Sequence, residues 1–547
     1  MAEMLIMQRA RGRIDVLTSP DSPDRYEDQH GTCLVTGPRY HRPAAGEVAK
    51  AWRRSPRAAA GLDGHFVAMY HDKRANTTTI LRDKAGFGHV YHARTADGWM
   101  CSTSLSWLAR RRKELGEDVR LSRSGIGLYL AFQYIPTPYT PLESVHQLPP
   151  GCRLALREGE APTVDKLMSY PEDTVATDAD GLAEQAATVV EILREEGAAR
   201  GEHLDGKVGM LFSGGMDSST NAAVYAEFLG LRPSGFTAQF AEAYYDETDS
   251  ARVVADHYKV DHHVVPVSVG SLGDLETLVK AFDSPNADQA IFAEWTVAKA
   301  AAEAGCGWMI TGEGGDEVLG YPQSHDGDLR VGELPLANDA LARSYFEKTY
   351  LTNGALRSRL YDRLDVEESL PYDVLAGIYR GHPSRSPFER VLFGQWATWL
   401  VDGVYPKDVC VFGALGIEPV MPFTNTRLMS YVAALPGDGK LRGLDDKRFL
   451  RTALGKVLPR DVLRKPKHKF WLPFETWFRE DQVAVSYLRD HLLCNGLVNE
   501  VFGRDLTERL LAEHVQSQAD HSRILWALLF LELWYQQHAS SWASIPS

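Results

Sequence analysis

A glycine- and serine-rich segment, residues 213–219 (SGGMDSS), follows the apolar stretch 208–212 and precedes a helical pattern that begins near Thr220. Glycines let the backbone turn sharply and direct successive N–H groups into one concavity, and the N-terminus of the following helix adds a positive dipole. Such a loop binds phosphate oxygens. Because the P-loop pattern GxxxxGKS/T is absent from the sequence, we predict a pyrophosphate-binding loop of another kind.

A second glycine-rich segment, residues 311–317 (TGEGGDE), also follows a short apolar stretch, 308–311. Open α/β sheets bind their ligands at the C-terminal ends of parallel strands, so carboxylates placed there are candidates for a ligand site. Proteins hold Mg²⁺ by one or two carboxylates together with substrate phosphates. We therefore predict that Asp217 and Asp316 bind magnesium, which leaves Glu313 to contact the substrate.

A basic segment, residues 464–470 (RKPKHKF), lies near the C-terminal end of the chain. A lysine that reaches an α-phosphate or a developing oxyanion from a separate segment would supply the charge that phosphoryl and acyl transfer both need. The pattern alone favours a solvent-exposed patch. Lys467 becomes a candidate only through the family resemblance that the three segments share.

The N-terminal part of the chain indicates an antiparallel sheet. Between about residues 60 and 105, apolar and polar residues alternate as in half-buried strands, and the polar run 72–76 is typical of a turn. The proline-rich stretch 134–151 that follows enforces extended or turn conformations. We expect the passage between two domains after it, with domains at 1–170 and 171–547.

From about residue 180, alanine-rich helical patterns alternate with short apolar strands. This alternation predicts βαβ crossovers and a parallel sheet covered on both faces. After about residue 325 the pattern becomes mostly helical. The chain is therefore predicted to be an α/β protein, with parallel strands at 208–212, 234–238, 263–267 and 308–311.

The composition restricts the class of protein. The chain has 547 residues, of which 44% are hydrophobic and 24% charged, and this excludes disordered and disulfide-scaffold classes. A net charge of −14 argues against a nucleic-acid partner. The six cysteines form no CxxC pair, which fits a reducing cytoplasm. The longest apolar stretch, 524–535, falls short of the roughly 20 residues of a membrane span, so no membrane association is expected and we predict a buried helix.

The three segments, in this order, resemble the synthetase domain of glutamine-dependent asparagine synthetases. Further segments resemble the same family: 64–66 (GHF), 81–86 (LRDKAG), 148–151 (LPPG), 245–247 (YDE), 282–285 (FDSP), 417–423 (IEPVMPF), 458–461 (LPRD) and 525–534 (LWALLFLELW). The resemblance implies an N-terminal glutaminase-like (Ntn) antiparallel αββα sandwich. It also implies a C-terminal parallel-sheet domain of the ATP-pyrophosphatase (adenine nucleotide α-hydrolase-like) type with a helical extension.

Carried over position by position, the resemblance assigns roles and implies ATP and Mg²⁺ as cofactors. Lys467 faces the adenylate, and Glu313 contacts the reaction intermediate. Asp217 and Asp316 are magnesium ligands. The nucleotide is bound by Leu211, Ser213, Gly214, Gly215, Asp217, Ser218 and Gly312.

Two departures from the family pattern change the predicted chemistry. Family glutaminase domains use a cysteine as the mature N-terminal residue, whose α-amine serves as base; here the second residue is Ala2 and the first cysteine is Cys33. We therefore predict a glutaminase-like fold without glutaminase activity. The family's DRxSM segment has no match near 400–404, its PFLD reads PFTN at 422–425, and residues 322–390 match nothing, so we predict a rebuilt acid-binding pocket.

Relatives without the cysteine resemble two groups, β-lactam synthetases and the macrolactam cyclases of lasso peptides. Both activate a carboxylate as an acyl-AMP that an amine of the same molecule attacks. β-Lactam synthetases carry tyrosine at the position of Glu313, which favours the lasso-type hypothesis. We predict an ATP-dependent, AMP-forming carbon–nitrogen ligase of antibiotic biosynthesis that acts on a peptide or small-molecule carboxylate and amine.

Other hypotheses stay open. They are β-lactam synthesis, ammonia-dependent asparagine synthesis, sulfur or nitrogen transfer to RNA, and a non-catalytic homologue, although the last would be expected to lose Asp217, Asp316 or Lys467. A partner protein that processes a precursor peptide and a homo-oligomer also stay open. The sequence does not name the substrate.

Overall fold

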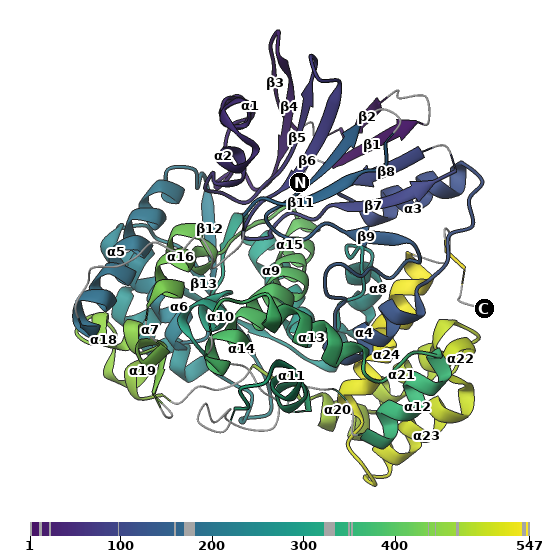
Figure 1. Ribbon diagram of the computed structural model, residues 1–547. Coiled ribbons are helices and arrows are strands. Elements are labelled where there is room, and N and C mark those ends of the chain that lie inside the picture. Colours follow the sequence, from purple (N-terminus) through teal and green to yellow (C-terminus); the bar gives the residue numbers. More distant parts are fainter. Residues whose placement is uncertain are drawn as a thin grey trace.

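The structure is a computed structural model. It describes residues 3–9, 14–20, 23–96, 98–157, 160–168, 181–321, 334–347, 351, 354–384, 386–435, 437–442, 445–465, 470–538 and 543–544. Antiparallel sheets come first along the chain, a parallel sheet follows, and a largely helical part completes it (Figure 1). The predicted domain boundary at 170 and 171 lies outside the described residues.

The N-terminal domain contains two sheets in which every strand pair is antiparallel. The five-stranded sheet has the order β2-β1-β8-β7-β9, with strands at Met4–Arg9 (β1), Ile14–Thr18 (β2), Tyr91–Thr95 (β7), Gly98–Ser102 (β8) and Val145–Gln147 (β9). The six-stranded sheet has the order β11-β10-β6-β5-β4-β3, with strands at Asp24–Glu27 (β3), Gly31–Thr36 (β4), Val67–Asp72 (β5), Thr77–Arg82 (β6), Cys152–Arg157 (β10) and Thr163–Lys166 (β11).

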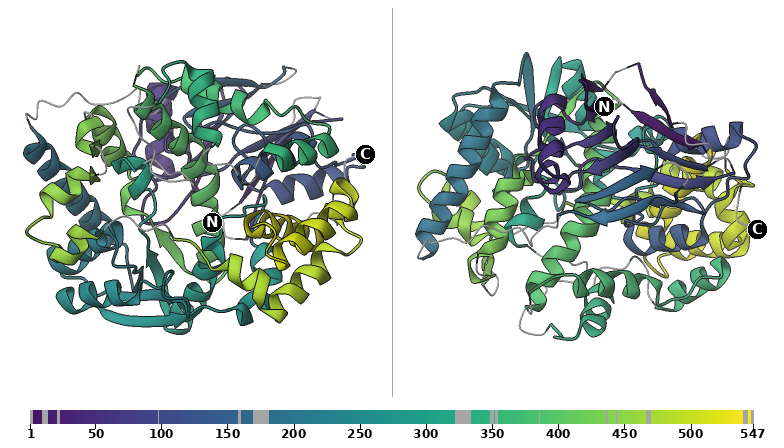
Figure 2. Two further views of the ribbon diagram at one scale, coloured as in Figure 1. Left: turned by 90° about the horizontal axis from the view of Figure 1, so that it is seen from below. Right: turned by 45° about the horizontal axis from the view of Figure 1, so that its top comes forward.

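The alternation of the strands produces two cores, one on each face of the six-stranded sheet. In β4, Leu34 packs between the two sheets, whereas Cys33 and Val35 face the helices Ala45–Arg54 (α1) and Pro56–Ala60 (α2). The outer face of the five-stranded sheet is covered by Leu105–Glu114 (α3) and Arg123–Phe132 (α4). The predicted antiparallel αββα arrangement is therefore confirmed, and Figure 2 shows its layers.

The second domain is built on a five-stranded sheet of order β14-β13-β12-β15-β16, in which every pair is parallel. The four predicted strands are present within one or two residues of their expected ends, and Glu418–Val420 adds an edge strand. The strands are Lys207–Leu211 (β12), Ser234–Gln239 (β13), Asp261–Pro266 (β14), Cys306–Ile310 (β15) and Glu418–Val420 (β16).

Helices cover both faces of this sheet. One face packs on Ala290–Glu303 (α9) and the other on Leu182–Gly201 (α5), Met216–Ala222 (α6) with its π-helical continuation Ala223–Phe228 (η1), and Thr248–Tyr258 (α7). Short helices at Val269–Asp274 (η2), Leu275–Val279 (α8) and Gly315–Leu319 (α10) complete this part. The doubly covered parallel sheet agrees with the prediction.

The rest of the chain is mostly helical, as predicted. Two short strands, Leu441–Arg442 (β17) and Asp445–Asp446 (β18), pair with one another. The remaining helices are Asn338–Glu347 (α11), Gly354–Leu364 (α12), Leu370–Arg380 (α13), Pro387–Gln395 (α14), Trp396–Val404 (η4), Tyr405–Gly413 (α15), Pro422–Thr424 (η5), Thr426–Ala434 (α16), Gly437–Lys440 (α17), Arg448–Ala453 (α18), Arg460–Arg464 (α19), Phe474–Glu480 (α20), Gln482–Leu492 (α21), Leu497–Phe502 (α22), Arg504–Val515 (α23) and Ser522–Gln537 (α24).

The apolar stretch 524–535 lies in α24. This helix is buried against α20, α21 and α22, and its Trp526 and Trp534 are among the most buried side chains of the protein. The prediction of a buried core helix is confirmed. Across the described part of the chain, no helix combines the length and apolarity that crossing a bilayer requires.

Hydrogen bonds attach the N-terminal domain to the second domain. Asp283, which lies in the segment 282–285, accepts the N–H groups of Leu105 and Ser106 at 2.8 and 3.2 Å, at the start of α3. The carbonyl of Gln133 accepts the N–H of Ala287 at 2.7 Å. These contacts hold the residues that follow α4 against the parallel-sheet domain, where Gln133 and Tyr134 line a cavity.

Candidate functional site

The loop between β12 and α6 is shaped by its glycine and serine residues. Gly214 has a φ of 66°, and a Cβ atom there would lie 2.3 Å from the backbone carbon of Ser250, so the position excludes a side chain. Ser213 Oγ accepts the N–H of Gly215 at 3.2 Å, and Ser218 Oγ accepts the N–H of Ser213 at 3.3 Å. The helix begins at Met216 rather than near Thr220, because the loop residues already form its first turn.

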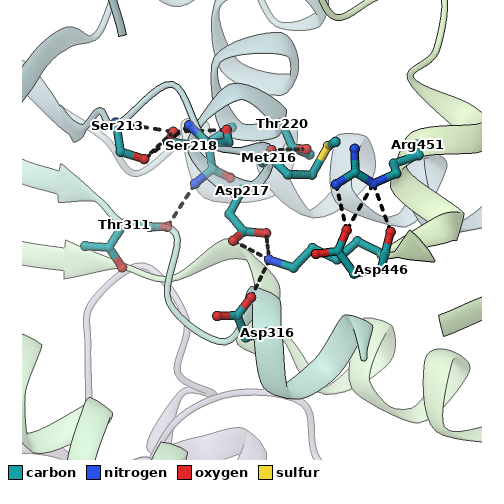
Figure 3. A network of polar contacts seen from close by, with 12 residues as sticks. Ser213, Met216, Asp217, Ser218, Thr220, Thr311, Asp316, Asp446 and Arg451 are labelled. Atoms are coloured by element: carbon teal, nitrogen blue, oxygen red, sulfur yellow. Dashed lines mark hydrogen bonds and ion pairs between the residues drawn. The ribbon is translucent and has the colours of Figure 1, made fainter. Parts of the chain in front are cut away.

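The second glycine-rich segment packs directly against this loop. Asn221 of α6 donates a hydrogen bond to the carbonyl of Thr311 at 2.9 Å. Figure 3 draws this bond as the dashed line at Thr311. A Cβ atom on Gly315 would lie 2.6 Å from Asp217 Oδ1, and one on Gly312 would lie 3.2 Å from Asp217 Cβ. The two segments therefore meet at the C-terminal ends of adjacent parallel strands, as predicted.

A buried lysine joins the two predicted magnesium ligands. Lys447 Nζ lies 2.5 Å from Asp217 Oδ1 and 2.5 Å from Asp316 Oδ1, and its side chain is 1% exposed. Asp217 and Asp316 point toward one another in Figure 3. Lys447 has no sequence signal, because a single lysine between β18 and α18 belongs to no recognisable motif.

One cavity of about 380 Å³ contains these groups, a size within the usual range of ligand pockets. Gly214 does not line it; its part is to let the chain turn. The predicted site residues that line the cavity are Leu211, Ser213, Gly215, Asp217, Ser218, Gly312, Glu313 and Asp316.

Lys467 lies outside the described residues. Lys465 and Phe470 are the described residues on either side of positions 466–469, and both line the cavity. Lys465 Nζ is paired with Glu247 Oε1 at 2.7 Å, and Glu247 belongs to the segment 245–247. Lys465 and Phe470, the described residues next to positions 466–469, therefore lie at the cavity.

A second buried lysine lies within a group of carboxylates in the same cavity. Lys407 Nζ is 2.6 Å from both Glu294 Oε1 and Glu313 Oε1, and 3.6 Å from Asp288 Oδ2 and Asp408 Oδ1. Burial disfavours the ammonium form, but the carboxylates outweigh it and hold the pKa of Lys407 well above its ordinary value. Burial raises the pKa of Glu294 to about 7. Neither residue carried a sequence signal, because α9 and α15 show only ordinary helical patterns.

Aromatic side chains form another wall of the cavity. Phe132 and Tyr134 come from the N-terminal domain, and Tyr134 packs against Trp399 of η4 with ring centroids 5.6 Å apart. Tyr345 of α11 and Leu375 of α13 also line this part. Both lie in the stretch 322–390, in which the sequence shows no interpretable motif, so this part of the chain contributes to the pocket.

Comparisons with known proteins agree with this arrangement. The model of the asparagine synthase family matches residues 195–536, and the model of the glutamine amidotransferase domain matches residues 48–166. The first match spans more than half of the chain. This protein belongs to the asparagine synthase family.

Relatives in this family are similar to the chain over most of its length. A Mycobacterium tuberculosis (strain ATCC 25618 / H37Rv) protein provisionally named asparagine synthetase (glutamine-hydrolyzing) is 25% identical over 512 residues, which cover 87% of this chain and 76% of the relative. Asparagine synthetase (glutamine-hydrolyzing) 1 of Bacillus subtilis (strain 168) is 23% identical over 511 residues, which cover 87% and 78%. The chain is thus an asparagine synthetase-like, ATP-dependent amide-forming ligase of a family that uses ATP and Mg²⁺.

Cys33 of this asparagine synthase family member lies inside its amidotransferase-like sheet. The residue is fully buried in the middle of β4, between Tyr26 of β3 and Tyr70 of β5. Burial, with a smaller effect of Asp24, raises the pKa of the Cys33 thiol to about 12. A thiol of this kind is neither accessible nor ionised near neutral pH, so Cys33 is no candidate nucleophile.

Proposed function

We propose that this family member adenylates a substrate carboxylate and couples the acyl group to an amine of the same substrate, without taking ammonia from glutamine. The observation that carries the proposal is the single cavity in which the phosphate-type loop, the Asp217–Asp316 pair, Glu313 and an aromatic wall come together. The adenylation step is the chemistry of the family. The substrate is proposed to differ from aspartate, because the pocket has an aromatic wall that aspartate would not cover.

The proposed position of ATP follows from the loop. Its pyrophosphate would lie against the N–H groups of residues 213–218, where Ser213 and Ser218 hold the loop in shape. Asp217 and Asp316, which both contact the Lys447 ammonium, offer hard oxygen donors of the kind that suits Mg²⁺. When bound there, the ion would neutralise phosphate charge. Lys447 sits against both carboxylates and would contribute positive charge at the leaving pyrophosphate.

Two further groups are proposed to act on the acyl adenylate. Lys467 would face the α-phosphate and stabilise the charge that develops in adenylate formation and in the tetrahedral step. Glu313 lines the cavity and is held by Lys407 at 2.6 Å, so its free oxygen would orient the intermediate. The substrate carboxylate attacks the α-phosphorus, pyrophosphate leaves, and the amine then displaces AMP.

The nitrogen source is proposed to be the substrate itself. Cys33 is buried in β4, and burial raises the pKa of its thiol, so this cysteine does not offer a glutaminase nucleophile. That domain instead contributes Phe132 and Tyr134 to the wall of the cavity. Its role in this proposal is to shape the substrate pocket.

The aromatic wall favours a substrate larger than aspartate. Phe132, Tyr134, Tyr345 and Trp399 offer apolar area that a small dicarboxylic amino acid would not cover. We therefore propose a peptide substrate and a macrolactam product, as in lasso peptide cyclisation, with a β-amino acid and a β-lactam product as the second candidate. We also propose that the protein acts in the cytoplasm, that it works with a partner protein that processes the precursor peptide, and that it forms a homo-oligomer.

The test is carboxylate-dependent ATP–pyrophosphate exchange on the purified full-length chain. The panel contains aspartate, a β-amino acid with a second carboxylate, and linear peptides with a free N-terminal amine and an internal Asp or Glu. Exchange with a peptide, and a product lighter by one water without added glutamine or ammonia, would support macrolactam formation. Exchange only with aspartate, with product only when ammonia is added, would contradict it. Lys467→Ala should abolish product while ATP still binds.

A further inference from the structure

The group of carboxylates around Lys407 carries a surplus of negative charge. Asp288, Glu294, Glu313 and Asp408 all lie within 3.6 Å of the Lys407 ammonium, so four carboxyl groups surround one cation. Burial raises the pKa of Asp408 well above its usual range, so the negative charge of the group comes from the other three. Three of them, Asp288, Glu294 and Glu313, line the cavity. A pocket wall with this imbalance attracts a second cation and repels an anion.

Among the described residues, Glu294 Oε2 and both carboxyl oxygens of Asp408 are buried without a hydrogen-bond partner, and of these two side chains only Glu294 lines the cavity. Glu294 is paired with Lys407 through Oε1, whereas its Oε2 is buried and accepts no hydrogen bond from any described residue. The Glu294 side chain is 9% exposed and lines the cavity. A buried carboxylate oxygen left in this state costs free energy, which a donor on a bound ligand would recover.

We propose that Asp288, Glu294 and Glu313 form the subsite for the substrate's amine, which binds there as an ammonium ion. This inference rests on the proposed function, because it assigns the second half of that reaction to a set of residues. The ammonium would donate to Glu294 Oε2, and Lys407 would act as a positioning residue that holds Glu294 and Glu313 in fixed orientations. The aromatic wall lies beside this subsite. The N–H of Ala287 donates a hydrogen bond to the carbonyl of Gln133, and these residues are the chain neighbours of Asp288 and Phe132, respectively.

The proton balance of the step follows. The amino group arrives as R–NH₃⁺ and transfers one proton to the Glu294 carboxylate. The neutral nitrogen then forms the C–N bond as the bond between the acyl carbon and the AMP oxygen breaks. AMP leaves with the electron pair, and the second proton leaves the nitrogen for Glu313. Burial raises the pKa of Glu294 to about 7; Glu313 and Asp288 also raise this pKa, and Lys407 lowers it. A pKa in this range suits a proton acceptor near neutral pH.

The subsite can be tested without knowing the natural substrate. The probes are three molecules of similar shape, 2-phenylethylamine, 2-phenylethanol and 3-phenylpropanoate, titrated calorimetrically into the full-length chain. Because a hydrogen bond to a charged group contributes roughly 1.5–3 kcal/mol, the amine should bind at least about tenfold more tightly than the alcohol. The carboxylate should bind most weakly. Equal binding of amine and alcohol, or no binding of the amine, would overturn the inference.

Variants locate the effect. Glu294→Gln keeps the shape of the side chain and should reduce the affinity for the amine by about tenfold, with little change for the alcohol. Asp288→Asn provides a second variant of the same subsite if Glu294→Gln does not fold. The matched control is Glu389→Gln, since Glu389 pairs with the buried Lys440 at 2.9 Å and lies outside the cavity lining. Unchanged amine affinity in both subsite variants would contradict the inference.

A second readout separates this inference from the proposed function. Glu294→Gln should retain carboxylate-dependent ATP–pyrophosphate exchange and lose at least about 100-fold in amide formation, the usual contribution of a positioned base. Absence of exchange in the wild-type chain would contradict adenylation, whereas the amine titration would still report on the subsite. Exchange and amide formation that fall in parallel in Glu294→Gln would argue against a role limited to the amine.

Discussion

The ammonium of Lys407 lies 2.6 Å from Oε1 of Glu313, a residue 94 positions earlier in the chain. The lysine side chain is 2% exposed, and the other ion-pair partners of its ammonium are also carboxyl groups. A buried ammonium in this environment is needed to balance the surrounding negative charge. The orientation of Glu313 in the cavity therefore depends on α15, an element that supplies none of the predicted site residues.

Replacing Lys407 by methionine should destabilise the protein by about 3–5 kcal/mol, because the carboxylates around it lose the cation that they share. Urea unfolding followed by circular dichroism measures the change. Lys440→Met is the matched control, since Lys440 is equally buried but pairs with a single carboxylate, that of Glu389, among the described residues. We expect a smaller loss there and unchanged amide formation. Equal losses in the two variants would mean that the size of the carboxylate group does not matter.

Asp217→Asn should reduce Mg²⁺-dependent ATP–pyrophosphate exchange by at least about 100-fold, because the phosphate-binding end of the cavity loses one of two oxygen anions that suit the metal. Exchange rates measured across a magnesium titration test this. Asp249→Asn on α7 is the control, since that side chain is almost fully exposed and pairs with Arg252 on its own helix. Undiminished exchange in Asp217→Asn would refute the metal role.

Gly214→Ala should lower both stability and exchange activity, because the added methyl group would meet the backbone of Ser250 and force the loop to move. A positive φ alone costs roughly 1–2 kcal/mol for a residue with a side chain. Gly206→Ala isolates that part, since Gly206 has a φ of 74° and nothing within 4 Å of its Cβ position. Thermal unfolding of both variants should show the larger shift at Gly214, with loss of exchange there alone.

Asp402 should make the free energy of unfolding fall as the pH rises from about 4 to about 6. Burial raises its pKa from 3.8 to about 6, while Arg82 and hydrogen bonds from Thr137 and Gln147 lower it. The folded state therefore holds the proton more tightly, and the stability from this group is complete below the unfolded pKa and lost as the pH passes the folded one. Urea unfolding at pH 4.5 and 6.5 should show a weaker dependence in Asp402→Asn; the same dependence would exclude this group as its source.

Much of the architecture followed from local patterns. The alternation between about 60 and 105, the apolar strands 208–212 and 308–311, and the buried helix at 524–535 all depend on residues within one element, whose periodicity reports which face is buried. The two glycine-rich loops were predicted at strand ends, and the structure brings them together because neighbouring parallel strands end at the same edge of the sheet.

Only the tertiary structure shows which lysines lie in the site. Lys407 and Lys447 occupy ordinary positions in their own segments, and each pairs with carboxylates that lie far away in the sequence. Lys407 is 94 residues from Glu313, and Lys447 is 230 residues from Asp217. The aromatic wall likewise depends on packing of the N-terminal domain against the parallel sheet. Periodicity and turn chemistry report interactions between near neighbours in the chain, whereas the pairing of buried charges depends on which distant elements share one cavity.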